Sequence, residues 1–306
     1  MKHAWMMIAS LAMSPVQAAN DYALKPVVIA DGVQVFVGRN EHFSRDNGGN
    51  IANTGFIIGS DGVIVIDTGP SRLYGEQQRA AIAKVTPKPI AQVYISHQHP
   101  DHYLGDQAYA GVPVAALPAT ISAIQSSGDA LADNLYRLVG GWMAGTQSLV
   151  PTQPVSAGEV SVAGRKLRLI AGTGHTDGDL MVYDVESKTL FAGDLVFFER
   201  TATTPNANVA HWLATLDEIG KLDFRTLVPG HGPVVHDAAA IEQTRDYLRW
   251  LTASLKSAAD RGLDMAEVMN QPIPPRFQHL AVLGEEYRRS VSHLYPDIEL
   301  QSLPKR

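Results

Sequence analysis

The sequence contains no cysteine among its 306 residues. A chain without thiols can form no disulfide, and it offers neither a thiolate metal ligand nor a cysteine nucleophile. Any metal site must therefore be built from histidine and carboxylate side chains. The absence is compatible with an oxidising compartment, where a thiol could form a wrong disulfide, but it does not by itself assign one.

Basic residues are also few. The chain has 25 Lys and Arg against 31 Asp and Glu, which gives a formal net charge of -6, and no dense run of Lys and Arg interrupts this balance. A nucleic-acid-binding domain usually presents a basic face. The composition therefore argues against a nucleic-acid partner and leaves a small-molecule substrate as the expectation.

Internal repeats, low-complexity segments and long hydrophobic runs are absent from the sequence. The apolar run at 4–13 is too short to span a bilayer. It follows Lys2 and precedes Ala18 and Ala19, which is the pattern of a cleaved secretory signal peptide. We therefore predict a signal peptide over residues 1–19, no membrane span, and a periplasmic mature protein.

The hydrophobic pattern of residues 20–236 predicts an α/β chain. Period-two alternation and Gly-containing turns predict four β-hairpins, and helical periodicity appears between them. The expected hairpins pair 27–29 with 33–37, 54–59 with 63–67, 159–162 with 165–170, and 181–184 with 189–192. The expected helices cover 71–85 (with Ser71 as the N-cap), 118–141 and 209–220, and single strands are expected at 90–96 and 112–117.

The last part of the chain, 237–306, has a helical pattern and contains no cluster of metal-ligand residues. Helices are expected at 238–259, 264–270 and 284–295, with prolines interrupting the region around 272–275. We interpret 237–306 as an extension that packs on the preceding domain, covers the mouth of its site, or forms a homodimer contact.

Four metal-ligand side chains are concentrated in the segment His97-Gln98-His99-Pro100-Asp101-His102. They follow the apolar run 90–96, so they lie after the carboxyl end of a strand, where open α/β sheets usually place their chemistry. His97 and His99 can converge on one cation, whereas Asp101 and His102 can face a second position. A zinc site needs about three protein ligands and an open position, so further ligands would favour two metals over one.

Further candidate ligands follow three later apolar runs. They are His175 in a Gly-His-Thr turn, Asp194 after a glycine, and His231 in Pro-Gly-His-Gly-Pro. The neighbouring glycines allow the backbone to approach a metal closely. Closed structural zinc sites have four ligands, commonly including thiolates. Seven ligand positions without cysteine therefore favour an open, catalytic two-metal site over a structural one.

In order and spacing, these motifs resemble those of the metallo-β-lactamase superfamily, and Asp67 in 65–69 fits the first motif of that family. The resemblance covers 27–236 and implies a four-layered αββα sandwich with 237–306 as a C-terminal helical extension of the same domain. It also implies that the glycine-rich loop 46–50 corresponds to a mobile flap over the metals.

The resemblance implies two Zn²⁺ ions per chain, with iron or manganese as alternatives. The first metal would be held by His97, His99 and His175, and the second by Asp101, His102 and His231, with Asp194 bridging the two. A metal-bridging hydroxide would attack a scissile carbonyl, and Asp101 would orient it. Asp67 has two interpretations: it fixes a ligating imidazole, or it caps the following helix.

Asp194 distinguishes branches of the superfamily. True class-B β-lactamases have Cys or Ser there, so the bridging Asp resembles the glyoxalase II, lactonase and arylsulfatase-like branches. The segments 50–55, 67–72 and 74–77 resemble more narrowly the exported quinoprotein relay system zinc metallohydrolases and SoxH-like proteins. An ester or thioester is the substrate class that this resemblance favours, with amides included.

Three alternatives remain open at this stage. The first is weak β-lactamase activity, for which Arg200 is the only cation near Asp194. The second is a mononuclear iron persulfide dioxygenase, which fills only one of the two metal positions. The third is a non-catalytic protein that binds a quinone or a sulfur intermediate.

Some residues allow a plainer interpretation. Trp142 and Met143 are expected to pack against the core rather than line the pocket. Asp177 and Asp179 are expected to form a turn. The remaining histidines are expected to be surface or core residues, with two exceptions that we place near the site mouth, His42 and His236.

Overall fold

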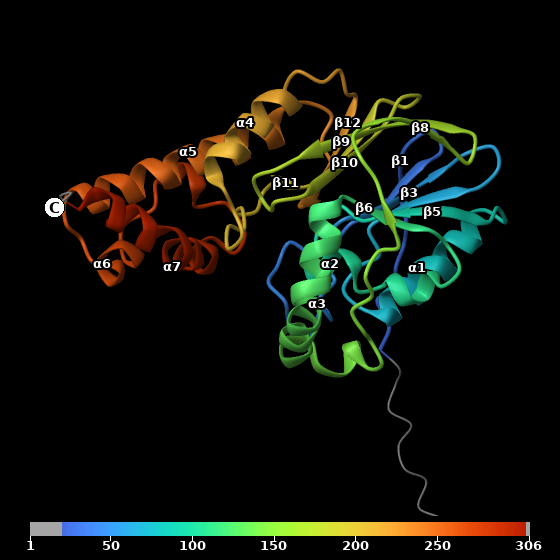
Figure 1. Cartoon of the computed structure of the whole chain (residues 1–306), viewed down its shortest axis with the longest axis horizontal. Helices are drawn as coiled ribbons and strands as arrows, with labels where there is room; N and C mark the ends of the chain where they lie inside the picture. Colours follow the sequence, from blue (N-terminus) through green and yellow to red (C-terminus); the bar gives the residue numbers. More distant parts are fainter. Residues whose placement is uncertain (1–19, 304–306) are drawn as a thin grey trace, which may run out of the picture.

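The computed structural model describes residues 20–303. The predicted signal peptide, 1–19, lies outside the described residues. Within 20–303, strands form two sheets with helices on both outer sides (Figure 1). None of the described helices is long and apolar enough to cross a bilayer.

The first sheet contains seven of the described strands in chain order. Its first four strands are antiparallel, and the pairs from the fourth strand onward are parallel. Two Asp-Gly turns close its hairpins, as the sequence predicts. The strands are β1 (Val27–Ala30), β2 (Val33–Phe36), β3 (Thr54–Ile58), β4 (Val63–Ile66), β5 (Ile90–Tyr94), β6 (Val114–Ala116) and β7 (Gln153–Pro154).

The second sheet has the order β12-β11-β10-β9-β8, and only its β11–β12 pair is parallel. Its strands are β8 (Gly158–Val162), β9 (Arg165–Gly172), β10 (Asp179–Asp184), β11 (Thr189–Phe197) and β12 (Thr226–His231). The strand β11 ends five residues beyond its predicted end at 192. Its pairing with β12 is irregular on both sides of Gly193. The pairing resumes at Phe197, opposite His231, so the strand includes Asp194.

The two sheets pack face to face through inward residues such as Ile64, Tyr94, Leu169 and Val182. The outer face of the first sheet is covered by α1 (Arg72–Val85) and α3 (Pro118–Val139), and that of the second by α4 (Val209–Ile219) and α5 (Ala239–Asp260). This arrangement is the αββα sandwich with C-terminal helices (Figure 1), so the predicted fold class is confirmed.

The C-terminal helices extend from the second sheet. The helix α5 packs on α4 and β11, and α7 (Leu283–Ser302) lies against α5, with the short α6 (Met265–Met269) beside it. The helix α7 is longer than the predicted 284–295 and contains Pro296. The buried Tyr295 and the partly buried Ile298 pack on either side of the proline, so tertiary packing continues the helix past it.

The segments that carry the candidate ligands lie close together at the ends of β5 and β12 and near the end of β11. Two backbone hydrogen bonds join the sheets at this edge: the Leu180 N–H donates to the Ser96 carbonyl (2.7 Å), and the Asn53 N–H donates to the Gly230 carbonyl (2.8 Å). The Asn53 side chain also donates to the Pro229 and Gly232 carbonyls. The two sheets are therefore held in a fixed relation at the edge that carries the candidate ligands.

Candidate metal centre

The segment His97–His102 forms the turn between β5 and α2 (Pro100–Tyr103). Pro100 occupies the first turn of α2, where its missing N–H costs nothing, and the His102 N–H donates to the His99 carbonyl (3.1 Å). The turn therefore places His97 and His99 before the helix, and Asp101 and His102 within it.

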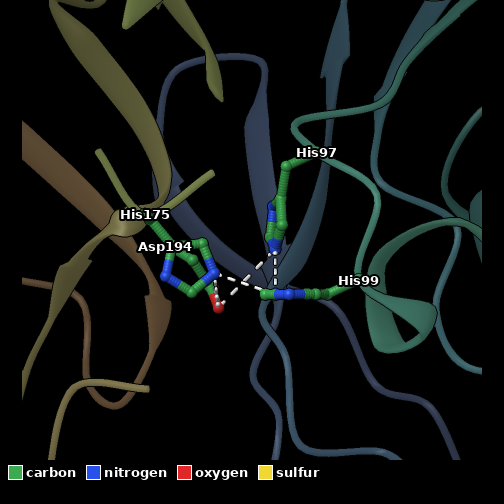
Figure 2. Close-up of side chains that lie close together, drawn as sticks. All are labelled: His97, His99, His175 and Asp194. Carbon is green, nitrogen blue, oxygen red and sulfur yellow. Dashed lines mark hydrogen bonds and ion pairs between the residues drawn. The ribbon is translucent and has the colours of Figure 1, made fainter. Parts of the chain in front are cut away.

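One group of four candidate ligands converges above this turn: His97, His99, His175 and Asp194 (Figure 2). The His99 Nδ1 lies 3.1 Å from the His97 Nε2 and 2.9 Å from the His175 Nε2. The Asp194 Oδ2 lies 3.3 Å from the His175 Nε2. Three imidazoles and a carboxylate thus direct their ligand atoms at one point.

A second group of candidate ligands adjoins the first: Asp101, His102 and His231. The Asp101 Oδ2 lies 3.4 Å from the His231 Nε2 and 3.8 Å from the His102 Nε2. All three residues are buried. The structure therefore brings together all seven candidate ligands named from the sequence, in two adjoining groups.

The Asp194 carboxylate lies between the two groups. Its Oδ2 is 3.7 Å from the His97 Nε2 in the first group and 3.3 Å from the His231 Nε2 in the second. Its Oδ1 is 3.2 Å from the His102 Nε2. A Cβ added to Gly230 would collide with the Asp194 Oδ1, so only glycine leaves room for the carboxylate at this position.

The outer nitrogens of four imidazoles have partners that direct the other nitrogen inward. The His102 Nδ1–H donates to Asp67 (2.7 Å), the His231 Nδ1–H to the Ile51 carbonyl (2.9 Å), and the His99 Nε2–H to the Asn206 Oδ1 (2.9 Å). The His97 Nδ1 lies 3.0 Å from the Ser96 hydroxyl. Such partners fix the tautomer and orientation that a ligating imidazole needs.

Asp67 contacts the base of the metal-binding turn rather than the helix after it. Its Oδ1 accepts from the Ser96 N–H (2.7 Å), and its Oδ2 accepts from the Ser96 hydroxyl (2.8 Å) and from His102. The N-cap of α1 is Ser71, whose hydroxyl accepts from the Tyr74 N–H. Asp67 also has φ +58°, a backbone conformation that costs energy and is held here by its surroundings.

The turn after His175 is fixed by Asp179. The Asp179 carboxylate accepts from the His175 N–H (3.1 Å), the Thr176 N–H (3.0 Å) and the Thr176 hydroxyl (2.7 Å). Burial raises the pKa of Asp179 to about 7, against the effect of these hydrogen bonds. The predicted turn is therefore present, and it also orients the backbone of a candidate ligand.

Burial also controls the charge of the cluster. Burial lowers the pKa of His97 and His175 well below the ordinary value, which favours the neutral form that binds metals. Burial alone would raise the pKa of Asp194, but the imidazoles of His231 and His102 hold it well below its ordinary value. His102 differs from His97 and His175: burial alone would lower its pKa, but the carboxylates of Asp194 and Asp67 raise it well above the ordinary value. The first group therefore presents neutral imidazoles and an ionised carboxylate.

The donor set fits two metal ions. A zinc ion with tetrahedral ligand bonds of about 2.0–2.1 Å separates its ligand atoms by about 3.3 Å. The separations within the first group, 2.9 to 3.7 Å, bracket this value. In the part of the chain that the structure describes, the buried His102 Nε2 and Asp194 Oδ1 have no hydrogen-bond partner although both face the cluster. Cations between the ligands would satisfy these atoms.

A pocket of about 230 Å³ opens beside the two groups. The metal side of the pocket is formed by residues such as His99, Asp101 and Asp194, and another side by Phe43 and Ile51 of the loop 38–53. Asn206 also lines it. The helix α7 contributes a further wall to the pocket through Glu286, Arg289 and His293.

The pocket corrects two predictions about histidines. His42 lines the pocket as expected, but His236 does not: it contacts the Thr226 hydroxyl at the opposite end of β12. His293, expected to be a surface or core residue, lines the pocket from α7. Met143 is buried in the core of the first sheet and Trp142 packs against that core, as predicted.

Three residues at the site were not predicted as site residues. Ser96 and Asn206 contact the imidazoles, and Arg200 lines the pocket. Ser96 could have been suspected because it directly precedes His97. Asn206 lies in a loop 31 residues after His175, where the sequence carries no signal for it.

Fold and site together define a class of protein: an αββα sandwich that holds paired His/Asp metal-binding groups at the common edge of its sheets. The chain belongs to the metallo-β-lactamase superfamily, whose family model matches residues 47–231, more than half of the chain. It carries the intact His-rich metal site of a metal-dependent hydrolase of that superfamily.

Individual relatives are distant. A linear primary-alkylsulfatase from a Pseudomonas species is 21% identical over 278 residues, which cover 76% of this chain and 52% of that protein. The human acyl-coenzyme A thioesterase MBLAC2 is 29% identical over 206 residues, which cover 60% of this chain and 74% of that protein. The chain thus spans only about half the length of the alkylsulfatase.

Solved structures show the same fold. A metallo-beta-lactamase from Pontibacter korlensis superposes with a TM-score of 0.60 at 21% identity, covering 74% of this chain and 99% of that chain. The metallo-beta-lactamase TMB-1 gives 0.59 at 20% identity, covering 75% of this chain and 98% of that one. Identities this low establish the fold alone.

Proposed function

We propose that the protein is an exported dinuclear zinc hydrolase that cleaves a small carbonyl ester, thioester or amide. The observation that carries the proposal is the position of the Asp194 carboxylate, within 3.7 Å of ligand nitrogens from both groups. A carboxylate so placed can bridge two cations. Bound as a pair, the metal ions would supply Lewis-acid polarisation of a carbonyl and an ionised water at neutral pH.

The residues of the chain would do the rest of the chemistry by positioning. Asp101 faces the pocket beside Asp194, where its carboxylate can accept a hydrogen bond from an attacking water and orient it. Asp67 and Ser96 would hold the imidazoles of His102 and His97, and Asn206 that of His99. The surrounding wall of Phe43 and Ile51 would limit the access of bulk water.

The relatives support an ester-like or thioester substrate. MBLAC2 is named as a thioesterase, and the Pseudomonas protein is named for a sulfate ester. The narrower resemblance to exported quinoprotein relay system metallohydrolases and SoxH-like proteins, together with the signal-peptide pattern of residues 1–19, supports export to the periplasm. We propose thioesters first because the thioesterase is the more similar of these two relatives.

The mononuclear iron persulfide dioxygenase remains the second candidate, because it would need only the first group of ligands. The second group, with Asp101, His102 and His231 all in place, favours the hydrolase. Metal analysis of the purified protein separates the two: about two zinc ions per chain supports the hydrolase, and one iron per chain supports the dioxygenase.

The activity itself is tested by assaying the purified full chain with S-lactoylglutathione, an aryl ester and nitrocefin. We expect turnover of the thioester or the aryl ester, abolished in Asp194→Ala and retained in Asp177→Ala, which removes an exposed carboxylate near His175. Turnover of nitrocefin alone would instead assign β-lactamase activity. Equal turnover by the Asp194→Ala variant would show that the activity does not depend on Asp194, which would contradict the proposal.

A further inference from the structure

One wall of the pocket is charged and belongs to no metal-binding group. It consists of Arg200, which follows β11, together with Glu286 and Arg289 of α7 and His42 of the loop 38–53. We call these four residues the charged wall. Glu286 and Arg289 lie beyond residues 47–231, the part of the chain that matches the superfamily.

Arg200 is buried to an unusual degree for a guanidinium. Arg200 is 3% exposed, and its Nη1 donates to the Glu41 carbonyl. Its Nε is buried and has no hydrogen-bond partner among the described residues. Arginine stays charged in proteins and has five N–H donors, so a buried Arg with an unused donor costs free energy. An anion in the pocket that Arg200 lines would offset the cost of burying its charge.

Glu286 partly neutralises this wall. It is 1% exposed, and its Oε1 lies 3.4 Å from the Arg289 Nη1 and 3.6 Å from the His42 Nδ1. Burial lowers the pKa of His42, which favours its neutral form. The other acidic partner of His42, Glu285, has a side chain that is 72% exposed and does not line the pocket.

The charges of the wall therefore do not cancel. Arg200 and Arg289 carry two positive charges against the single negative charge of Glu286. The carboxylates of Asp101 and Asp194 also act on Arg200, but bound metal ions would offset both of them. One positive charge thus remains beside the place where a substrate would react.

We propose that the charged wall binds an anionic group of the substrate, with a carboxylate as its simplest form, and so selects anionic esters and thioesters over neutral ones. This inference rests on the proposed hydrolase function. The planar guanidinium of Arg200 matches a carboxylate, and Arg289 supplies a second cation from α7. The helix α7 would then help to determine which substrates bind, and the metal-binding groups at the edge of the sheets would carry out the reaction.

The test uses two nearly isosteric thioesters that differ in charge, 3-(acetylthio)propanoate and 3-(acetylthio)propanamide. In the unmodified protein, we expect kcat/KM to be at least about tenfold higher for the carboxylate, because a charge-assisted hydrogen bond is lost with the amide. In Arg289→Gln, we expect this ratio to fall by about tenfold, mainly through a higher KM for the carboxylate.

The matched control is Arg288→Gln, which removes the same charge from the next residue of α7, an exposed arginine outside the pocket. We expect this variant to keep the preference. Replacing Arg289 does not endanger the fold, because its side chain is 49% exposed. Arg200→Gln should also reduce the preference, provided that the variant unfolds at the temperature of the unmodified protein.

Isothermal titration with N-acetyl-β-alanine and its carboxamide measures binding without turnover. If both thioesters turn over equally, the charged wall has no such role and the hydrolase function stands. If neither turns over but N-acetyl-β-alanine binds in preference to its amide, and Arg289→Gln removes that preference, anion binding stands and thioesterase function fails. If neither turnover nor binding is seen, both the thioesterase function and the anion binding are wrong. If the preference is unchanged in Arg289→Gln, α7 does not contribute to anion binding.

Discussion

The two walls of the pocket differ in how their side chains are held. On the metal side, four of the imidazoles have a partner for the nitrogen that faces away from the cluster. On the charged wall, the Arg200 Nε and the Glu286 Oε2 are buried without a partner in the described chain. The metal side also has buried atoms without a partner among the described residues, namely the His175 Nδ1 and, facing the place where cations would bind, the His102 Nε2 and the Asp194 Oδ1. The atoms of the charged wall instead lack an acceptor and a donor.

The two walls also differ in the secondary-structure elements that form them. The metal side is built at the ends of strands, where the sheets fix the backbone. The charged wall combines a loop, a single arginine and the C-terminal helix. The comparison indicates that the reaction and the choice of substrate are carried by separate parts of the chain, so they should respond separately to mutation.

The largest effect on the metal side is expected from Asp194→Ala. Because the Asp194 carboxylate lies between both groups, its loss should weaken both metal positions. We expect kcat/KM to fall by at least about 10³-fold and the metal content to fall below one ion per chain. Elemental analysis and steady-state kinetics measure both quantities. Full activity with two retained metals would show that Asp194 does not bridge.

A smaller effect is expected from Asp67→Asn. The amide would still fill the space, but it would lose the charge that orients His102 and the acceptor of the Ser96 hydroxyl bond. We expect metal affinity at the second position to fall by about 10- to 100-fold, with the first position less affected. Competition titration with a chelator measures the two affinities. Equal loss at both positions would mean that Asp67 supports the whole turn rather than His102.

Asn206→Ala should have a weaker effect than Asp67→Asn. The Asn206 side chain is exposed, and its one hydrogen bond among the described residues is to His99, so the ring would lose one orienting hydrogen bond. We expect about a threefold to tenfold loss of kcat/KM with unchanged thermal stability. Asn208→Ala would be a poor control because Asn208 caps the start of α4. The control for kcat/KM is Asn270→Ala, since the exposed Asn270 is the C-cap residue of α6 and does not line the pocket.

The smallest effect on activity is expected at Trp142, outside both walls. Trp142→Phe removes the hydrogen bond from the indole N–H to the Arg45 carbonyl (2.8 Å). We expect a loss of about 1 kcal/mol, or about 2–4 °C in Tm, with little change in kcat/KM. A thermal unfolding scan measures the first quantity. A large loss of activity would show that the loop 38–53 transmits changes to the pocket.

The metal side could be predicted from sequence because each ligand follows an apolar run and stands beside a glycine or within one short motif. Such local patterns predict both where a strand ends and which side chain follows it. The two interpretations of Asp67 could not be separated in this way, because Ser71, four residues later, was an equally suitable cap. Only the fold shows that Asp67 faces His102 and Ser71 caps the helix.

The charged wall could not be predicted, because its members lie far apart in the chain. Arg200 and Glu286 are brought together only when α7 packs against α5. One signal was present: Glu286, Arg289 and His293 are spaced three and four residues apart, so they share a face of a helix. The sequence alone does not show that this face turns toward a pocket rather than solvent.

Both metal-binding groups draw ligands from both sheets. His97, His99, Asp101 and His102 follow a strand of the first sheet, and His175, Asp194 and His231 belong to the second. Each bound ion would therefore cross-link the two halves of the sandwich, and its binding free energy would add to the free energy that holds them together. The lifetime of the folded protein should then depend on the local supply of metal, and an ion-depleted chain should open first along the seam between its sheets.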